Sequence, residues 1–334
     1  MTLVAPSFAA SSDTSNQANA TMIEIDGTKL SFADVERQKP GVFFHAVNTF
    51  YQGEQSALKD FVDDYILDEQ AKKEGLTVDQ LLDKHVNSTI EKDPPEEALK
   101  VFYEGVDTTQ PYSAVRDQII QSIRARRTAK AKAAYMDTLR KDAKVSIRLT
   151  PPRAQVNLKD TPVRGPETAK VVLVEYADFE CPYCQQVQPT LSKLEKAYEG
   201  KLAFAYKDVP LPMHPHAEKA AEASHCAAAQ GKYWEYHDQL YSSRQLDVAQ
   251  LKEQARDLKL DGDAFDKCLD SGEKAPGVKA SLAEGQRLGI EGTPSFFMNG
   301  RFFSGGLTFE QLSAMIDEEL KTAEGQTKTV ASNE

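Results

Sequence analysis

Two cysteines separated by two residues form the most chemically informative motif in the sequence, Cys181-Pro182-Tyr183-Cys184. Where such a motif begins a helix, both sulfurs lie on one turn and are close enough to form a disulfide. The first cysteine then lies at the helix N-terminus, where unpaired N–H groups and the helix dipole favour a thiolate. Proline suits the first helical turn, because the N–H that it lacks has no partner there. The motif therefore predicts a redox-active dithiol with Cys181 as its nucleophile.

A zinc site is the alternative chemistry for this cysteine pair. Structural zinc needs four ligands, so two more would have to come from elsewhere in the chain. The nearby candidates are His214 and His216, and their spacing does not match the usual zinc pattern. Redox chemistry is favoured, and we expect no metal and no organic cofactor, since thiol–disulfide exchange needs neither.

The residues around the motif predict the strand-to-helix junction that this chemistry requires. Residues 170–176 (KVVLVEY) have the continuous apolar character of a strand buried on both faces, and a helical stretch follows the motif to Tyr198. The pattern predicts an α/β domain with further elements at 202–208 (strand), 215–288 (helices), 295–298 (strand, followed by an Asn299-Gly300 hairpin turn) and 308–322 (helix).

Several segments in combination resemble the DsbA-like thiol:disulfide oxidoreductases. The segments are 175–184 around the cysteine motif, 207–211 (KDVPL), 214–217 (HPHA) and 292–301 (GTPSFFMNGR). The resemblance covers about 165–322 and implies a thioredoxin fold with an inserted helical domain at about 212–288. The Cys-Pro-Tyr-Cys motif alone also matches glutaredoxins, but a chain of glutaredoxin size has no room for the long stretch between Cys184 and Thr293.

The resemblance also implies roles for four residues outside the motif. Thr293 and Pro294 would form a loop facing the disulfide, with a cis bond before Pro294, and its backbone would bond an extended client peptide. Glu175 matches a buried acidic residue that carries protons to or from Cys184. The alternative for Glu175 is a surface residue at the strand edge. Lys207 either pairs with Glu175 from the adjacent strand or is solvated.

Cys226 and Cys268 form a second pair of cysteines, in the expected helical insertion. They match positions where several members of the resembled family carry a structural disulfide. Such a bridge would stabilise the fold by roughly 4 kcal/mol in the chain-entropy model. The alternative is two independent buried thiols.

The preceding residues, 22–150, predict a separate and mostly helical domain. A strand at 22–25 leads through Asp26-Gly27 into a helix capped by Ser31. Helices are expected at 56–75, 77–86, about 97–103 and 112–143. Residues 144–149 alternate like a strand and are expected to pair with 22–25, which closes the domain with a short two-stranded sheet. Pro151 and Pro152 mark the boundary before the second domain, 151–325.

The domain at 22–150 resembles, in fewer features, the N-terminal domain of SurA-type periplasmic chaperones. The features are the strand–helices–strand plan, residues 71–82 (AKKEGLTVDQLL), and the end of the long helix at 143–153. No parvulin-type domain follows, so prolyl isomerase activity is not implied. The alternatives are a spacer or a module for homo-oligomerisation.

Composition and the chain ends exclude some classes of protein. The 51 acidic and 40 basic residues give a net charge of −11 without a Lys/Arg-rich run, which argues against a nucleic-acid binder. No run of roughly 18 apolar residues predicts a transmembrane helix. Residues 1–21 look like the remnant of a secretory signal peptide or a disordered terminus, and 326–334 like a disordered tail. We therefore expect a periplasmic or secreted protein.

The resemblances together imply a thiol:disulfide oxidoreductase fused to a peptide-binding domain. The Cys181–Cys184 pair is expected to oxidise reduced or misfolded client proteins and to be reoxidised by a membrane partner. An isomerase or reductase on the same fold is one alternative. A chaperone in which Cys181 and Cys184 form a merely structural disulfide is an alternative from another class.

Overall fold

The computed structural model describes residues 21–39, 41–105 and 108–331. The expected signal-peptide remnant, apart from Thr21, lies outside the described residues, as do the last three residues of the expected C-terminal tail. The described residues divide into two compact units, 50–150 and the remainder of the chain. None of the helices in these ranges is long and apolar enough to span a membrane.

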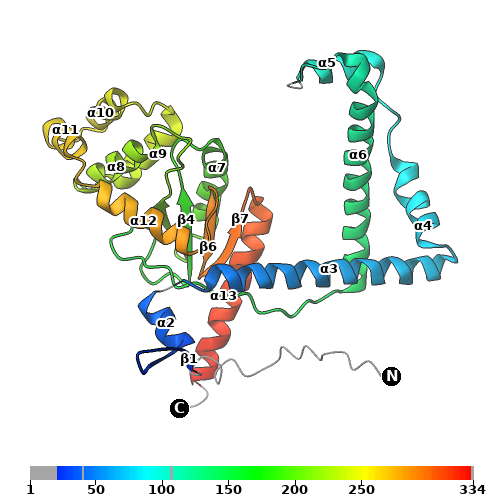
Figure 1. The fold of residues 1–334 in the computed structure, drawn as a ribbon, viewed down its shortest axis with the longest axis horizontal. Helices are drawn as coiled ribbons and strands as arrows, with labels where there is room; N and C mark the ends of the chain where they lie inside the picture. The colour runs from blue at the N-terminus through cyan, green and yellow to red at the C-terminus, as the bar shows by residue number, and fades with distance from the viewer. Residues whose placement is uncertain (1–20, 40, 106–107, 332–334) are drawn as a thin grey trace. The chain divides into compact units, whose positions relative to one another are not determined.

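A five-stranded sheet forms the centre of the unit that contains the cysteine motif (Figure 1). β4 and β5 are parallel, and the other neighbours in the sheet are antiparallel. Almost every residue of β4 and β5 is buried, as their apolar sequences predict. In spatial order the strands are β3 (Val163–Arg164), β5 (Leu202–Asp208), β4 (Val171–Ala177), β6 (Ser295–Met298) and β7 (Arg301–Ser304).

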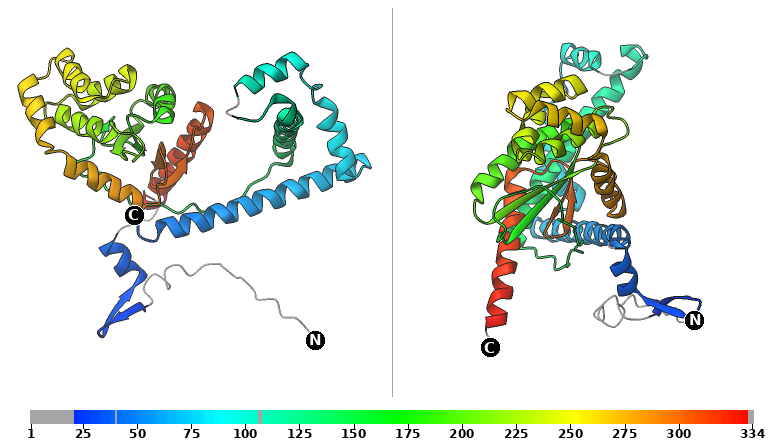
Figure 2. Two further views of the ribbon diagram at one scale, coloured as in Figure 1. Left: turned by 45° about the horizontal axis from the view of Figure 1, so that its top comes forward. Right: turned by 90° about the vertical axis from the view of Figure 1, so that its left-hand side faces the viewer.

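Helices cover both faces of this sheet (Figure 1, Figure 2). α7 (Pro182–Ala197) and α13 (Phe309–Ala331) pack on one face, against Leu173 and Phe296. The opposite face carries Val174 and Phe297, packed against the C-terminal end of α12 (Ala275–Arg287) and the residues that follow it. Successive residues of each strand thus serve opposite faces, which explains why both strands and their neighbours are apolar without interruption.

The expected helical insertion lies between β5 and β6. It consists of α8 (Ala217–Ala228), α9 (Tyr233–Ser243), α10 (Val248–Asp257), α11 (Gly262–Ser271) and α12. The predicted disulfide is present: Cys226 in α8 is bonded to Cys268 in α11, with a Cα–Cα distance of 5.9 Å. The bridge joins two helices whose buried residues belong to one hydrophobic core.

Residues 21–49 contain a β-hairpin, and its strand pairing differs from the prediction. β1 (Thr21–Ile25) pairs with β2 (Thr28–Ser31), not with 144–149, which have no regular secondary structure. The reason is the turn: Asp26 and Gly27 have φ values of 49° and 79°, which suit a two-residue hairpin. Closing so short a loop costs far less entropy than pairing strands at opposite ends of a domain. As predicted, Ser31 caps the next helix, α2 (Phe32–Gln38).

The unit at 50–150 is helical, as expected. It comprises most of α3 (Phe44–Glu74), then α4 (Val78–His85), the short 3₁₀ helix η1 (Asn87–Thr89), α5 (Glu96–Glu104) and α6 (Tyr112–Ala143). One small core joins α3, α4 and α6, and a second joins α5 to the start of α6. α3 begins at Phe44, well before the predicted residue 56.

The compact units differ from the predicted domains at the N-terminal end. Residues 21–49 group with the unit that contains the sheet. Phe44, the first residue of α3, is buried there, and its ring centroid lies 5.6 Å from that of Phe297. At the other end of the chain, α13 continues to Ala331, beyond the predicted end at 322.

Candidate active site

Both motif cysteines lie at the junction of β4 and α7. Cys181 is the N-cap residue of α7, Pro182 is the first helical residue, and Cys184 lies in the first turn. Both are free thiols. Cys181 is only 3% exposed and Cys184 is 0% exposed, so solvent exposure does not distinguish the two thiols. The Thr293 loop covers Cys181, whose Sγ lies 3.4 Å from the Thr293 carbonyl oxygen.

The two thiols differ in acidity instead. A hydrogen bond from the Cys184 thiol, together with contacts at Thr293 and the nearby backbone N–H groups, lowers the pKa of Cys181 to about 5 although burial opposes this. Burial is the main cause that raises the pKa of Cys184, and the hydrogen bond that its thiol donates to Cys181 adds to it. Near neutral pH the reduced pair is therefore a thiolate at Cys181 and a thiol at Cys184.

Glu175 is a buried acid, not a surface residue at the strand edge. It is 0% exposed on β4, and Gln188 Nε2 donates to its two carboxylate oxygens at 3.2 and 3.3 Å. Burial raises the pKa of Glu175 to about 8. Gln188 also donates to the Cys184 carbonyl oxygen at 3.2 Å. Glu175 is thus mostly protonated near neutral pH, and Gln188 connects it to the turn that carries Cys184.

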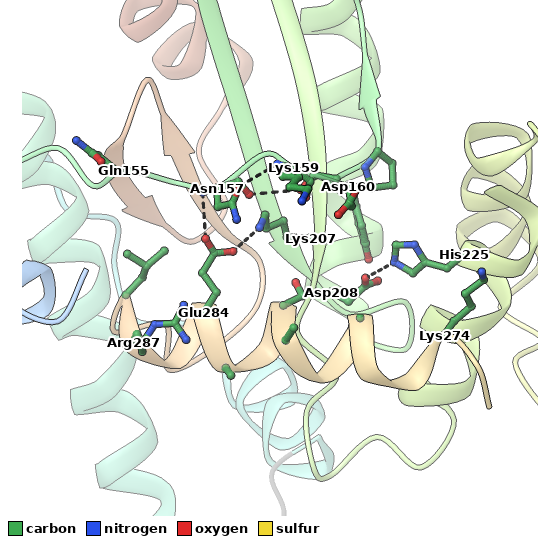
Figure 3. A pocket seen from close by; sticks show the side chains of 18 of the residues that line it. Gln155, Asn157, Lys159, Asp160, Lys207, Asp208, His225, Lys274, Glu284 and Arg287 are labelled. Atoms are coloured by element: carbon green, nitrogen blue, oxygen red, sulfur yellow. Dashed lines mark hydrogen bonds and ion pairs between the residues drawn. The ribbon is translucent and has the colours of Figure 1, made fainter. Parts of the chain in front are cut away.

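Lys207 does not pair with Glu175, and it is not solvated either. The parallel register places Glu175 opposite Tyr206, so the next residue, Lys207, faces the other side of the sheet. There its Nζ forms a buried ion pair with Glu284 of α12 (Figure 3). The predicted role of Lys207 beside the disulfide therefore has no support in this geometry.

The Lys207–Glu284 pair lines a cavity of about 720 Å³ between α12, the end of β5 and residues 155–162 (Figure 3). Glu284 also accepts a hydrogen bond from the Asn157 backbone N–H at 3.1 Å. On the same wall, His225 Nε2 lies 2.7 Å from the Asp208 carboxylate. The cysteines of the motif are not among the residues that line this cavity.

The remaining predicted site residues lie where the resemblance implied. Thr293 and Pro294 are joined by a cis peptide bond directly before β6. Thr293 provides the carbonyl oxygen beside Cys181.

Two groups at the site were missed by sequence reasoning. Gln188 is one, although its place one helical turn after Cys184 marked it as a neighbour. The other is a pair formed by Asp178 and His214, whose ring Nδ1 lies 2.7 Å from the carboxylate. His214 entered the sequence analysis as a possible zinc ligand and as part of the resembling segment 214–217, without a role in the exchange chemistry. No group of three or more metal-binding side chains occurs in the part of the chain that the structure describes.

This arrangement can perform thiol–disulfide exchange. An ionised Cys181 beside a protonated Cys184 is the pattern that nucleophilic attack on a disulfide requires. Glu175 has a pKa near neutrality and can give or take a proton below the pair.

Comparison with known proteins identifies the domain that carries these residues. The family model described as Thioredoxin matches residues 157–318. Among curated proteins, the Na(+)/H(+) antiporter NhaA 3 of Salinispora tropica is 40% identical over 156 residues, which are 46% of this chain and 24% of that protein. The Na(+)/H(+) antiporter NhaA of Herminiimonas arsenicoxydans is 34% identical over 178 residues, 53% of this chain and 28% of that protein. The chain thus spans about a quarter of the length of these relatives.

Several solved structures are similar to the half of this chain that contains the cysteine motif. Wolbachia pipientis alpha-DsbA1 has a TM-score of 0.47 and 23% identity, covering 52% of this chain and 96% of that one. BdbD from Bacillus subtilis has a TM-score of 0.47 and 23% identity, covering 51% and 98%. A thioredoxin-like oxidoreductase from Silicibacter pomeroyi DSS-3 has a TM-score of 0.45 and 28% identity, covering 48% and 93%.

The resemblance of residues 22–150 to SurA-type chaperones stays a prediction. For the C-terminal half, the predicted fold class is confirmed: it is a thioredoxin-like domain that contains the inserted helices and the Cys181–Cys184 pair.

Proposed function

We propose that this protein is a thiol:disulfide oxidoreductase that oxidises client proteins through Cys181 and Cys184. The observation that carries the proposal is the opposite shift of the two cysteine pKa values at one helix N-terminus. A thiolate stabilised in the reduced protein makes the disulfide form a stronger oxidant, since reduction then releases more free energy.

The exchange begins with the oxidised pair. A client thiolate attacks Cys181 Sγ, a new sulfur–sulfur bond forms to the client, and the Cys181–Cys184 bond breaks. The electron pair goes to Cys184 Sγ, which takes up a proton, and the raised pKa of Glu175 suits it as the donor. A second client thiolate then attacks the client sulfur of the mixed disulfide. Cys181 leaves as a thiolate, so the client is oxidised and the pair is reduced.

The proposal also covers the clients, the redox partner and the role of the helical unit. The clients are reduced or misfolded proteins outside the cytoplasm, and a membrane redox partner reoxidises the pair. Residues 50–150, the helical unit of the predicted domain 22–150, hold unfolded clients or assemble copies of the chain. Exposed large apolar side chains on this segment support contact with other chains: Phe50, Leu58, Phe61, Tyr65, Val101 and Phe102.

Trapping of intermediates tests the proposal. Cys184→Ser should accumulate mixed disulfides with a disulfide-bonded client protein, because the Cys181 thiolate attacks the client disulfide and the serine cannot then break the Cys181–client bond. Cys181→Ser should accumulate none. Non-reducing electrophoresis with mass mapping measures both. The proposal would be contradicted if the two variants behaved alike and the wild-type protein did not turn over an excess of client. That result would favour a chaperone in which Cys181 and Cys184 form a structural disulfide.

A further inference from the structure

A His–Asp pair lies at the start of α7, and the mechanism above gives it no role. His214 Nδ1 is 2.7 Å from Asp178 Oδ2, and Asp178 is 2% exposed. The same carboxylate accepts hydrogen bonds from the backbone N–H of Leu211 at 2.8 Å and of Glu180 at 2.7 Å. These bonds fix the histidine loop to the segment that precedes Cys181.

The pair belongs to the same turn as the nucleophile. The Asp178 carbonyl oxygen accepts a hydrogen bond from the Cys181 N–H at 3.1 Å, so the carboxylate is attached three residues before the reacting sulfur. The His214 side chain is 16% exposed. Among the described residues the His214 ring bonds only through Nδ1, which leaves Nε2 available to an incoming molecule.

The charges around His214 favour its protonated form. Burial alone would lower the pKa of His214, but the Asp178 hydrogen bond, the Cys181 thiolate and Glu180 together raise it above its usual value. The groups that raise it are thus all acids. Near neutral pH the ring gains and loses a proton readily and interacts with the charge on Cys181.

We propose that His214 is a catalytic residue that receives the proton of the attacking client thiol, with Asp178 as its positioning residue. This inference rests on the proposed function. The client S–H bond breaks and its proton moves to His214 Nε2, while the client sulfur attacks Cys181 Sγ. The Cys181–Cys184 bond breaks and its electron pair leaves on Cys184. The client sulfur is oxidised, Cys184 is reduced, and the imidazolium later releases its proton to water.

The two proton carriers thus serve different sulfurs. His214 lies on the client side, and Glu175 lies beneath Cys184. A client thiol that enters as a thiolate is stabilised by the imidazolium instead, which gives the same dependence of rate on pH. Whether the client attacks as a thiol or as a thiolate, His214 increases the rate only when its ring carries a proton in the transition state.

The test compares His214→Gln with wild type. The rate constant is measured for oxidation of a short dithiol peptide by the oxidised protein, from about pH 5.5 to 9.5, where the peptide thiols ionise near 8.5. The wild-type rate constant should exceed that of the variant roughly fivefold at the acidic end, the size of an attraction between exposed charges in contact. The ratio should fall to one at the alkaline end, with a single transition at the pKa of His214.

His216→Gln is the matched control, since His216 is an exposed histidine on the same loop. It should behave as wild type at every pH. A ratio of wild type to His214→Gln that is the same at every pH would mean that His214 is only structural, and the inference would be wrong. A wild-type protein that oxidises no peptide would overturn the proposed function itself.

A second measurement needs no variant. Nuclear magnetic resonance titration of wild-type protein should give His214 a higher pKa in the reduced state, where Cys181 is a thiolate, than in the oxidised state. Equal values in the two states would place His214 too far from the reacting sulfur to act and would overturn the inference even if the variant failed to fold.

Discussion

Cys181 and Cys184 occupy one turn of α7, yet their surroundings give them opposite protonation near neutral pH. The Cys184 thiol donates a hydrogen bond that lowers the pKa of Cys181 to about 5. The same thiol is buried more deeply, which raises its own pKa. One hydrogen bond therefore contributes to both shifts, and the two residues act as a unit.

Selective alkylation follows from this difference. Iodoacetamide should label Cys181 before Cys184 when the reduced protein is treated at about pH 5.5, because the thiolate is the reactive form. Peptide mapping by mass spectrometry gives the order of labelling. Preferential labelling of Cys184 would reverse the assignment of the nucleophile.

Glu175 should make the stability of the reduced protein depend on pH. Burial raises its pKa from 4.5 to about 8, so between these values the folded protein holds a proton that the unfolded chain has lost. Stability therefore falls as pH rises through this window, by a few kcal/mol in total. Glu175→Gln should remove this pH-dependent contribution to the free energy of unfolding. Urea unfolding at several pH values measures that free energy for both proteins.

The comparison uses the difference between variant and wild type, since other groups titrate in both. Glu199→Gln, an exposed glutamate just after the end of α7, is the control and should follow wild type. If the difference between Glu175→Gln and wild type is the same at pH 5 and pH 8, Glu175 does not hold the proton that the mechanism requires.

At the scale of elements, sheet register decides which side chains meet. β4 and β5 are aligned so that Glu175 lies opposite Tyr206, and Lys207 turns toward α12. There it pairs with Glu284. The ion pair thus joins the sheet to the inserted helices on the face away from Gln188.

Breaking this pair should affect stability without affecting the thiols. Lys207→Met leaves the buried Glu284 charge uncompensated, and we expect it to lower the free energy of unfolding by about 3–5 kcal/mol. Lys207→Met combined with Glu284→Gln should recover part of that loss. Urea unfolding measures both, and alkylation of Cys181 should keep its wild-type pH profile. A raised pKa of Cys181 in Lys207→Met would indicate that Lys207 acts on the thiols, and it would contradict the Lys207–Glu284 pair.

Local signals in the sequence predicted elements well, and contacts between distant segments poorly. The helix start at Cys181 and Pro182, the cap at Ser31 and the turn at Asn299-Gly300 each depend on a few adjacent residues. The partner of Lys207 depends on strand register and on a helix far along the chain, and no local pattern encodes either. Asp178 and His214 were missed for the same reason.

At the scale of the whole molecule, residues 21–49 support the thioredoxin-like domain. Phe44 is buried against Phe297, in a core that also contains Leu288. The sequence suggested a domain closed at 144–149 because these residues alternate like a strand, but they form no strand, and β1 pairs with β2 instead. A fragment beginning at Pro151 would therefore lose part of the packing of its own core.

A test of whether residues 50–150 bind clients must allow for the core packing that a fragment beginning at Pro151 loses. The fragment 151–331 should oxidise a short dithiol peptide as fast as the full chain but a large reduced protein more slowly, since the tethered unit raises local client concentration. Full-length Phe44→Ala is the control, because it loses about 3 kcal/mol of packing yet keeps residues 50–150. Equal rates of fragment and full chain on the large client would indicate a spacer or an assembly module.

The most direct test of the account is equilibrium titration of the Cys181–Cys184 pair against glutathione. Mass mapping must show that Cys226–Cys268 remains intact throughout. Stabilisation of the Cys181 thiolate predicts a reduction potential closer to about −120 mV, the value of a strong oxidant, than to about −270 mV, that of a reductant. A potential at or below the latter value would contradict the proposal that this protein oxidises its clients.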